Sequence, residues 1–443
     1  MTGNWNRRWL YPLRTGLRSM ARSPWLSALM VLAVALGIAA AMTMLTVLHD
    51  LAGNPLPQRS DVLFHPQVDP RPLDLPGARR APPDNLTYLD AVNLYRLDGA
   101  PRRAIMSSTW LPLRTTVAGN PLRMETMRAT TRDFFPMFDV PFQYGGPWSA
   151  QDDARRALVV VLSQTLNDRL FGGTDSVGRT LIIATKLFRV VGVLEHWNPQ
   201  PHFWDLDDGA YGKGARFYLP FFTWLTLPQD YGYGPMDCYG ANPGAGNHDP
   251  KAPHCTWVQM WVQLNTPAQV RAYHRLLVRY SLQQKTLGRF QRPPNVRLMS
   301  LMRWLDYKRV VPVMVRMQTW IAFGVFLVCL LNVVGLMVAR FLRKAGEIGV
   351  RRALGASRGD IFRQCLIETA CIGLAGGVLA LPLVALGLWM VRQQTAEFAR
   401  VAHLDMPMLG LTLLLATLAT ALAGIWPAWR TARQSPAIVV KTL

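Results

Sequence analysis

The chain contains 443 residues, of which 50% are hydrophobic and only 17% are charged, whereas a soluble domain carries about 25% charged residues. Its 48 lysines and arginines outnumber its 27 aspartates and glutamates, which gives a formal net charge of +21. The high hydrophobicity excludes a disordered chain and argues against an ordinary cytosolic enzyme. Two explanations of the charge remain: a nucleic-acid-binding surface, or arginines placed beside membrane-spanning helices.

Residues 1–22 form a basic leader that contains five arginines and no acidic residue: Arg7, Arg8, Arg14, Arg18 and Arg22. The uncharged run Ser23–Leu48 follows, and its 26 residues exceed the roughly 20 that a helix needs to cross a hydrocarbon core of ~30 Å. Ala39–Ala41 would suit a signal-peptide cleavage site, but a cleaved signal has a shorter leader and an apolar region of about 7–15 residues. We therefore expect a retained transmembrane helix at 23–48.

The segment 49–316 has a mixed pattern that predicts an α+β ectodomain. Short β-branched runs bounded by glycine and polar residues favour strands at Ala157–Leu162, Thr180–Ala184 and Phe188–Leu194. The alternating pattern of Trp257–Leu264 favours a further strand. Two stretches favour helices, Thr87–Leu97 and Pro267–Leu287. The second of these helices has Thr266 as an N-cap and a proline in its first turn.

Residues 196–255 are rich in glycine, proline and aromatic residues, which predicts a long irregular excursion of functional or mobile character. Cys238 and Cys255 lie near its end on the expected outer side of the membrane, where oxidation permits a disulfide between them. A zinc site with His248 and His254 is the alternative, although the spacing matches no structural zinc pattern. The remaining cysteines lie in or near the expected spans and are interpreted as small hydrophobic side chains: Cys329, Cys365 and Cys371.

Three further uncharged runs, at 317–339, 369–391 and 406–429, predict three C-terminal transmembrane helices. Lysine and arginine are abundant in 340–368 and 430–443, so these segments and the leader are expected in the cytoplasm, with 49–316 and the short loop 392–405 outside. Since the basic residues follow the ends of the spans, nucleic acid is not an expected partner. The four runs contain no carboxylate, histidine or arginine, which argues against an ion-coupled transporter. Any energy source is expected in another chain.

Familiar catalytic motifs are absent or out of context. The sequence contains neither GxxxxGK[ST] nor HExxH, so neither a P-loop nor that zinc-protease motif is predicted. A literal GxSxG occurs at Gly355–Gly359, but a nucleophile elbow needs a preceding buried strand, and here a basic, helix-like stretch precedes it. An esterase is therefore not expected.

Residues 344–368, which we call the elbow, favour two short helical segments at the cytoplasmic surface. Ile348, Arg351 and Leu354 recur at helical spacing, the region of Gly355 ends the helix, and Ser357 can cap a second helix that runs toward the third span. The elbow is either an interfacial helix with snorkelling arginines or a docking surface for a cytoplasmic partner.

At the elbow, EIGVRRALGASRGDIFRQCLIE resembles the signature of the FtsX/MacB-type ABC transporter permeases. The tail WPAWRTARQSPAIVVKTL is similar to the C-terminal end of that family, and Thr130–Leu194 is similar to its periplasmic core domain. The basic leader before the first span is similar too. The resemblance implies four transmembrane α-helices, one N-terminal and three C-terminal. A large α+β periplasmic ectodomain, with porter-like and Sabre-like subdomains, would be inserted between the first and second helices.

The resemblance also implies a role for the elbow. Its first part would be the coupling helix that contacts an ATPase subunit, through the residues Glu347, Ile348, Val350, Arg351, Arg352, Leu354, Gly355 and Ala356. In this family the ectodomain is moved by ATP-driven dimerisation of cytoplasmic subunits, and the spans are not thought to form a substrate channel. Gly373 and Gly377, in a GxxxG pattern of the third span, would allow two helices to approach closely.

The implied protein is a permease of the bacterial inner membrane with both termini in the cytoplasm. No cofactor is expected in this chain, because ATP and Mg²⁺ would be bound by a dimer of cytoplasmic ABC ATPase subunits. Since the first residues run straight into a span, a separate ATPase is expected. Further expected partners are a second permease copy or a sister permease, membrane lipids, and, for export from the cell, a periplasmic adaptor and an outer-membrane duct.

Three alternatives to an exporter remain open. Two belong to the same superfamily: lipoprotein extraction and regulation of a cell-wall hydrolase. The third is a membrane-anchored extracytoplasmic enzyme or sensor, for which the ectodomain shows no cluster of carboxylates or histidines with convincing spacing. Residues 196–255 look like an insertion into the family pattern.

Overall fold

The computed structural model describes residues 23–73, 81–116, 121–206, 209–228, 231–239, 249–394 and 406–433. These residues divide into two compact units, an α+β domain at 53–310 and a helical unit built from the segments on either side of it. The expected leader at 1–22 and most of the expected loop 392–405 and tail 430–443 lie outside the described residues.

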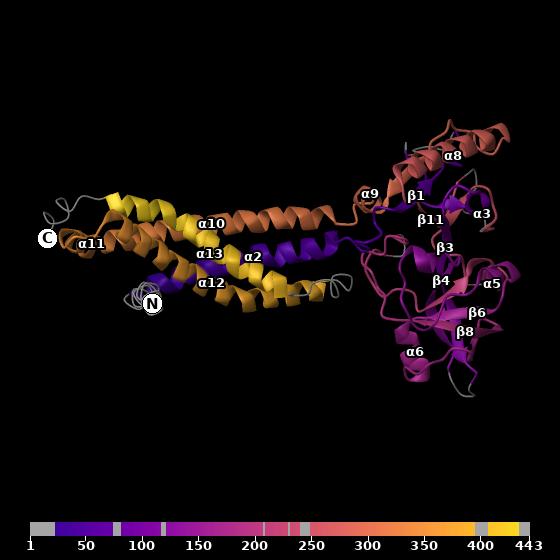
Figure 1. Cartoon of the computed structure of the whole chain (residues 1–443), viewed down its shortest axis with the longest axis horizontal. Helices are drawn as coiled ribbons and strands as arrows, with labels where there is room; N and C mark the ends of the chain where they lie inside the picture. The colour runs from indigo at the N-terminus through magenta and orange to yellow at the C-terminus, as the bar shows by residue number, and fades with distance from the viewer. Residues whose placement is uncertain are drawn as a thin grey trace, which may run out of the picture. The chain divides into compact units, whose positions relative to one another are not determined.

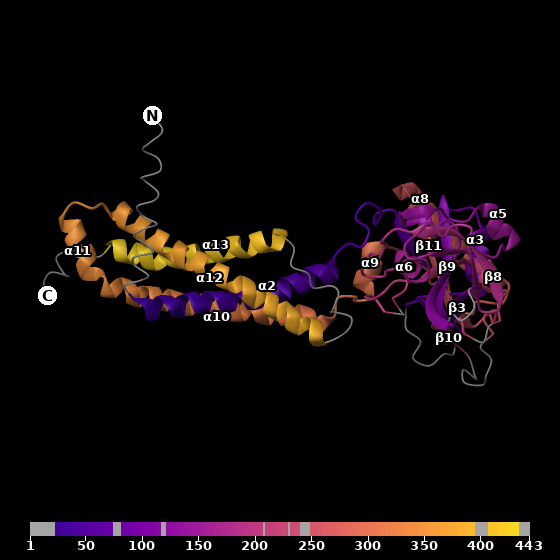
Figure 2. The ribbon, with the colours of Figure 1, turned by 90° about the horizontal axis from the view of Figure 1, so that it is seen from below.

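The described residues of the helical unit form four long helices and one short one. The long helices are α2 (Pro24–Ala52), α10 (Val313–Arg343), α12 (Arg358–Gln394) and α13 (Met406–Arg433), and the short one is α11 (Ala345–Ala353). Each long helix contains a stretch that is long and apolar enough to cross a membrane. Figures 1 and 2 show these four helices alongside one another, with α11 at the end where α10 and α12 meet.

The long helices extend beyond the uncharged runs from which they were predicted. The run 317–339, for example, lies inside the 31-residue helix α10. Long basic side chains tolerate the boundary of an apolar layer because they extend toward water, so a charge at the end of a run does not end the helix. This matters at the elbow, where charged residues lie within the helices.

The four long helices pack closely at glycines. A Cβ atom on Gly37 of α2 would come within 2.9 Å of the Cβ of Cys329 on α10, and one on Gly376 of α12 within 2.6 Å of Val34 on α2. A Cβ on Gly424 of α13 would come within 2.6 Å of Thr369 on α12. Because dispersion and close packing hold helices together in lipid, such small residues allow backbones to approach.

The α+β domain contains twelve strands around which its helices lie. The strands are β1 (Leu63–Gln67), β2 (Leu86–Thr87), β3 (Arg102–Thr115), β4 (Arg123–Thr130), β5 (Phe142–Gly145), β6 (Val159–Leu162), β7 (Thr180–Ile183), β8 (Lys186–Leu194), β9 (Phe217–Pro220), β10 (Asp237–Cys238), β11 (Cys255–Gln263) and β12 (Arg297–Ser300). The helices are α3 (Tyr88–Arg96), α4 (Phe134–Met137), α5 (Ala150–Arg155), α6 (Gln164–Phe171), α7 (Phe221–Trp224), α8 (Pro267–Thr286) and α9 (Leu301–Tyr307). The predicted strands and helices therefore lie within a few residues of their expected positions.

The strands form one sheet in the order β12-β1-β11-β3-β4-β9-β6-β8-β5, with β2 and β10 paired to β11. β7 pairs with both β3 and β8. The strands β3, β4, β9, β6, β8 and β7 therefore form a closed ring of pairings. The expected division into porter-like and Sabre-like subdomains stays a prediction, since the domain is one compact unit.

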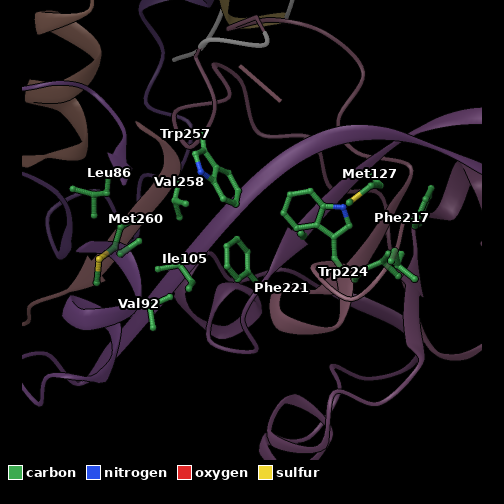
Figure 3. Close-up of a cluster of buried hydrophobic side chains, with 14 of the residues drawn as sticks. Leu86, Val92, Ile105, Met127, Phe217, Phe221, Trp224, Trp257, Val258 and Met260 are labelled. Atoms are coloured by element: carbon green, nitrogen blue, oxygen red, sulfur yellow. The ribbon is translucent and has the colours of Figure 1, made fainter. Parts of the chain in front are cut away.

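Strand alternation produces two hydrophobic cores, one on each face of the sheet. Along β3, Ile105 and Leu111 enter the first core, while Ala104 and Met106 enter the second. Successive side chains of a strand point to opposite faces, which explains this alternation. Figure 3 shows part of the first core, in which Phe221 and Trp224 lie near Trp257. The second core is rich in aromatic side chains such as Phe138 and Trp204.

Most of the described residues of 196–255 are irregular, but the segment also contains β9 and contributes side chains to both cores. β9 lies inside the sheet, parallel to β4 and antiparallel to β6. Phe203 and Trp204 are buried in the second core, and Phe221 and Trp224 in the first. The aromatic residues are thus core residues of the domain, supplied by a segment whose many glycines and prolines hid its one strong strand. Residues 240–248 lie outside the described part.

Candidate functional site

The first half of the elbow is the nine-residue helix α11, which is tied to its neighbours by Arg351. One guanidinium nitrogen of Arg351 lies 2.7 Å from a carboxylate oxygen of Glu347, one turn earlier on the same helix. Another donates a hydrogen bond of 3.0 Å to the amide oxygen of Gln364 on α12. Since Glu347 and Arg351 are both about 45% exposed, the pair itself adds little stability, but it orients the arginine toward α12.

The turn between α11 and α12 follows the predicted chemistry. Gly355 has a φ of +100°, a left-handed conformation that glycine adopts without a steric cost. Ser357 then caps α12: its hydroxyl accepts from the backbone N–H of Asp360 at 3.1 Å, and the Asp360 carboxylate accepts from the backbone N–H of Ser357 at 3.3 Å. This reciprocal capping box fixes the direction in which α12 starts.

Aliphatic side chains are exposed at the end of α11. Leu354 is 83% exposed and Val350 is 54% exposed, whereas Ile348 and Ala356 are partly buried. The side chain of Arg352 lies outside the described part of the structure. Val350 and Leu354 thus leave aliphatic surface exposed beside the charged side chains of Glu347 and Arg351.

We call one group of side chains the charged junction: the charged Arg340, Lys344 and Glu368, and the polar Ser27. Lys344 and Glu368 are the first and last residues of the elbow, and Lys344 is partly buried. The ammonium of Lys344 lies 3.0 Å from the carboxylate of Glu368, which joins the end of α10 to α12. The guanidinium of Arg340 donates to the hydroxyl of Ser27 at 3.1 Å, which joins α10 to α2. Arg340 is 3% exposed and Glu368 is 5% exposed. The junction thus connects three helices at the point where the elbow begins and ends.

The charged junction was missed by sequence reasoning because the spans were defined as uncharged runs. Arg340 follows the run 317–339 and Glu368 precedes the run 369–391, so each charge was assigned to the cytoplasmic loop. In the structure both residues lie within helices, at α10 and α12. A search for charges of opposite sign immediately outside two adjacent spans would have found the pair.

The structure also shows the residues of the predicted disulfide, of the alternative zinc site and of the GxSxG sequence, in so far as they are described. Cys238 and Cys255 form a disulfide between the paired strands β10 and β11, so their sulfurs are not available as thiolate ligands for zinc. His248 lies outside the described residues, and among those described no group of three metal-ligating side chains occurs. The hydroxyl of Ser357 donates to Asp360 at 2.6 Å as part of the helix cap.

The two glycines of the predicted GxxxG pattern face α13. A Cβ atom on Gly377 would lie 2.9 Å from the Cβ of Ala416, and one on Gly373 would collide with the hydroxyl of Thr420. Both glycines therefore lie where α12 and α13 pack together. The structure thus places the pattern within the chain's own helical unit.

Two protein-family models match this chain. The MacB-like periplasmic core domain matches residues 27–279, and the FtsX-like permease C-terminal domain matches residues 320–436. The first model covers more than half of the chain, and the expected insertion at 196–255 lies within its bounds. The second covers the elbow and the charged residues Arg340, Lys344 and Glu368.

Curated relatives are similar over most of this chain. The pyoverdine export ATP-binding/permease protein PvdT of Pseudomonas aeruginosa is 23% identical over 90% of this chain and 54% of its own length. The macrolide export ATP-binding/permease protein MacB of Azoarcus sp. is 25% identical over 85% of this chain and 51% of its own length. The chain thus spans about half the length of these relatives.

Among solved structures, the periplasmic region of MacB from Actinobacillus actinomycetemcomitans is similar, with a TM-score of 0.35 and 15% identity over 56% of this chain and 94% of that one. The two family matches, together with the four candidate spans, confirm the predicted fold class of a multi-pass membrane protein with an inserted α+β domain. The chain belongs to the FtsX/MacB-type ABC transporter permeases.

Proposed function

We propose that this chain is the permease subunit of a MacB-like exporter and transmits ATP-driven motion from a cytoplasmic ATPase to its α+β domain. The domain that binds ATP and Mg²⁺ lies outside these 443 residues, in a dimer of separate subunits that contacts the exposed Val350 and Leu354. The permease lies in the bacterial inner membrane with the elbow on the cytoplasmic side, and a second permease copy completes the complex.

The charged junction is the observation that carries this proposal. Charged side chains inside a membrane-spanning unit are costly and mark function by default. Here, Lys344 and Glu368 hold the two helices that flank the elbow, while Arg340 and Ser27 hold α10 against α2. A displacement of α11 therefore shifts α2, α10 and α12 together.

The chain also connects the helices of the charged junction to the α+β domain. α2 ends at Ala52, immediately before the α+β domain, and α10 begins at Val313, shortly after it. Two of the three helices joined at the charged junction are thus covalently continuous with the domain that is to be moved. The uncharged interior of the spans suits helices that move as rigid rods, whereas an aqueous channel needs polar groups along its length.

The cargo is proposed from the relatives alone. Two relatives are named for the export of pyoverdine and of macrolides, so we propose a small molecule that is taken up from the periplasm or the inner membrane. A periplasmic adaptor and an outer-membrane duct would then carry it across the outer membrane.

Affinity purification tests the partner. The tagged chain, extracted from its native membranes, should co-purify with a P-loop ATPase. Leu354→Asp should remove that subunit, because a charge replaces the exposed aliphatic contact. Leu187→Asp is the matched control, since Leu187 is 56% exposed in the α+β domain. Recovery of the ATPase with the Leu354 variant would contradict docking at the elbow.

Reconstituted vesicles test the transmission. Glu368→Lys should leave the ATPase bound and hydrolysing, but transport should fall by about tenfold, a typical size for lost coupling between sites. The charge-swapped double variant Lys344→Glu, Glu368→Lys should recover much of the loss. Glu347→Ala and Arg351→Ala should weaken stimulation of hydrolysis as well as transport. If transport and hydrolysis are unchanged in all of these variants, transmission through the elbow is wrong.

A further inference from the structure

The α+β domain contains a pocket that the transmission of motion does not use. Its volume is about 370 Å³, within the range of roughly 300–1,000 Å³ that is usual for small-molecule sites. The floor is formed by strands β3 and β4, and the cover by described residues within 202–205 and 209–216. Both parts belong to one compact unit, so the pocket is a property of this domain alone.

The register of β3 and β4 places polar and aromatic side chains on the floor. Ser108 is paired with Arg128, and Trp110 is paired with Thr126. Directly opposite residues of an antiparallel pair lie on the same face, so these four side chains share one face of the sheet. All four line the pocket.

A buried carboxylate fixes the cover on this floor. Asp205 accepts hydrogen bonds from Arg128 at 2.7 Å, from Ser108 at 2.5 Å and from Gln259 at 3.0 Å. The side chains of Arg128 and Asp205 are 7% and 2% exposed. Because this network is buried and its members bind one another, it holds the walls of the pocket in place before any ligand arrives.

The walls offer aromatic surface. Trp110 is 52% exposed, although residues 104–109 before it on β3 are buried. Across the pocket, Trp204 and Tyr211 are buried in the cover. An indole that remains half exposed at the mouth of a pocket is a stacking surface for a planar ring.

The charges around the pocket are unbalanced among the described residues. Arg128 is neutralised by Asp205, and Glu125 lies 2.5 Å from Arg169. Lys213 and Arg216 also line the pocket, and no carboxylate in the described part of the chain lies within 4.0 Å of either cation. Asp207 and Asp208 precede this part of the cover and lie outside the described residues. Lys213 and Arg216 are the kind of side chain that binds an anion through charge-assisted hydrogen bonds.

We propose that this pocket binds a small planar aromatic anion, whose ring stacks on Trp110 and whose carboxylate or similar group is held by Lys213 and Arg216. The proposal concerns binding alone and does not rest on coupling to an ATPase. Cation–carboxylate hydrogen bonds are stronger than neutral ones, and the ring provides apolar contact with the indole. Neutral and cationic rings of the same shape would lack the charged contact and bind more weakly.

The test uses the full-length chain in nanodiscs of uncharged lipid and the fluorescence anisotropy of three naphthalene probes. These are 2-naphthoate as the anion, 2-naphthalenemethanol as the neutral compound and 2-naphthylmethylammonium as the cation, each corrected with empty nanodiscs. The anion should bind saturably and about tenfold more tightly than the other two, as expected for one charge-assisted contact. Lys213→Glu should remove most of this preference.

Comparison of Trp110→Ala with Lys213→Glu separates the contribution of ring stacking to binding from that of the charge. Trp110→Ala should weaken the binding of all three probes, whereas Lys213→Glu should weaken the binding of the anion only. Leu187→Ala and Arg279→Glu are matched controls at exposed positions of the same domain outside the pocket, and they should change nothing. Absence of saturable binding, preference for the cation, or unchanged affinity in both pocket variants would overturn the proposal. Because Trp110 and Lys213 are exposed, their replacement leaves the fold intact, which thermal unfolding checks.

Discussion

The helical unit and the α+β domain each contain a buried ion pair, but the two pairs join different kinds of structure. Lys344 and Glu368 connect two helices, each of which satisfies its backbone hydrogen bonds internally. Arg128 and Asp205 connect a sheet to residues 202–216, a segment with almost no regular backbone pairing of its own. Loss of the first pair therefore leaves its helices formed, whereas loss of the second removes what holds its segment in place.

Because the two pairs join different kinds of structure, we expect substitutions at them to affect different properties, namely transport for the first and unfolding for the second. In the helical unit, side chains determine how formed elements move together, so changes there should affect transport more than unfolding. In the α+β domain, side chains determine whether the cover of the pocket is folded onto the sheet, so changes there should affect unfolding first. Four predictions test this contrast.

The largest expected effect is that of Asp205→Ala. It leaves the Arg128 guanidinium buried without its carboxylate and should lower the free energy of unfolding by about 3–5 kcal/mol. Chemical denaturation, followed by tryptophan fluorescence, measures it. Asp139→Ala is the control, because the Arg59–Asp139 pair is 30% and 43% exposed and should cost at most about 1 kcal/mol. If Asp205→Ala and Asp139→Ala lower the free energy of unfolding equally, the buried pair does not hold its segment in place as described.

Removal of the disulfide comes next. The double variant Cys238→Ser, Cys255→Ser opens a loop with a sequence separation of 17 and should cost about 3 kcal/mol, chiefly by freeing the unfolded chain. The free energy of unfolding under non-reducing conditions measures this loss. Addition of a reductant to the parent protein should cause the same loss of unfolding free energy. If this loss is smaller than that caused by Asp205→Ala, the buried ion pair stabilises the domain more than the disulfide does.

A packing change in the helical unit should have an intermediate effect. Gly373→Leu forces a side chain against Thr420 on α13 and should cost about 1–3 kcal/mol. Gly324→Leu on α10 is the matched control, because a Cβ atom there meets nothing within 4 Å. Thermal unfolding in nanodiscs distinguishes the two variants, and a control as damaging as Gly373→Leu would contradict the packing assignment.

At neutral pH the smallest effect is expected at His202, and it grows as the pH falls. Burial, reinforced by the Arg128 guanidinium, lowers the pKa of His202 to about 4. As the pH falls from 7 to 4, the unfolded chain takes up a proton that the folded chain does not, so stability decreases by at most about 1.4 kcal/mol per pH unit. His202→Gln should flatten the curve of unfolding free energy against pH between 4 and 7. A curve with the same slope in the variant would show that another group is responsible.

The sequence allowed the helices and most of the fold to be predicted. A membrane-spanning helix is determined by its own composition, because its hydrogen bonds are local and its surface must be apolar. The elbow was predictable for a similar reason, since Gly355 and Ser357 act on residues within a turn of themselves. The predicted strands were those with unbroken β-branched runs, such as Val159–Leu162.

What could not be predicted depends on partners far apart in the chain. β9 is a strand because β4 and β6 lie on either side of it, and its own four residues, which end in Pro220, do not show this. The charged junction requires residues 27, 340, 344 and 368 to meet. The pocket likewise combines β3, β4 and a later segment, so neither site has a sequence pattern of its own.

The closed ring of strands has a mechanical consequence. A sheet with a free edge can be peeled one strand at a time, whereas each of the six strands in this ring is paired on two sides. A pulling force must then shear several rows of hydrogen bonds at once, so the ring yields little before it breaks. If the domain receives motion as proposed, such a stiff body would lose less of the displacement to internal strain than a softer sheet would.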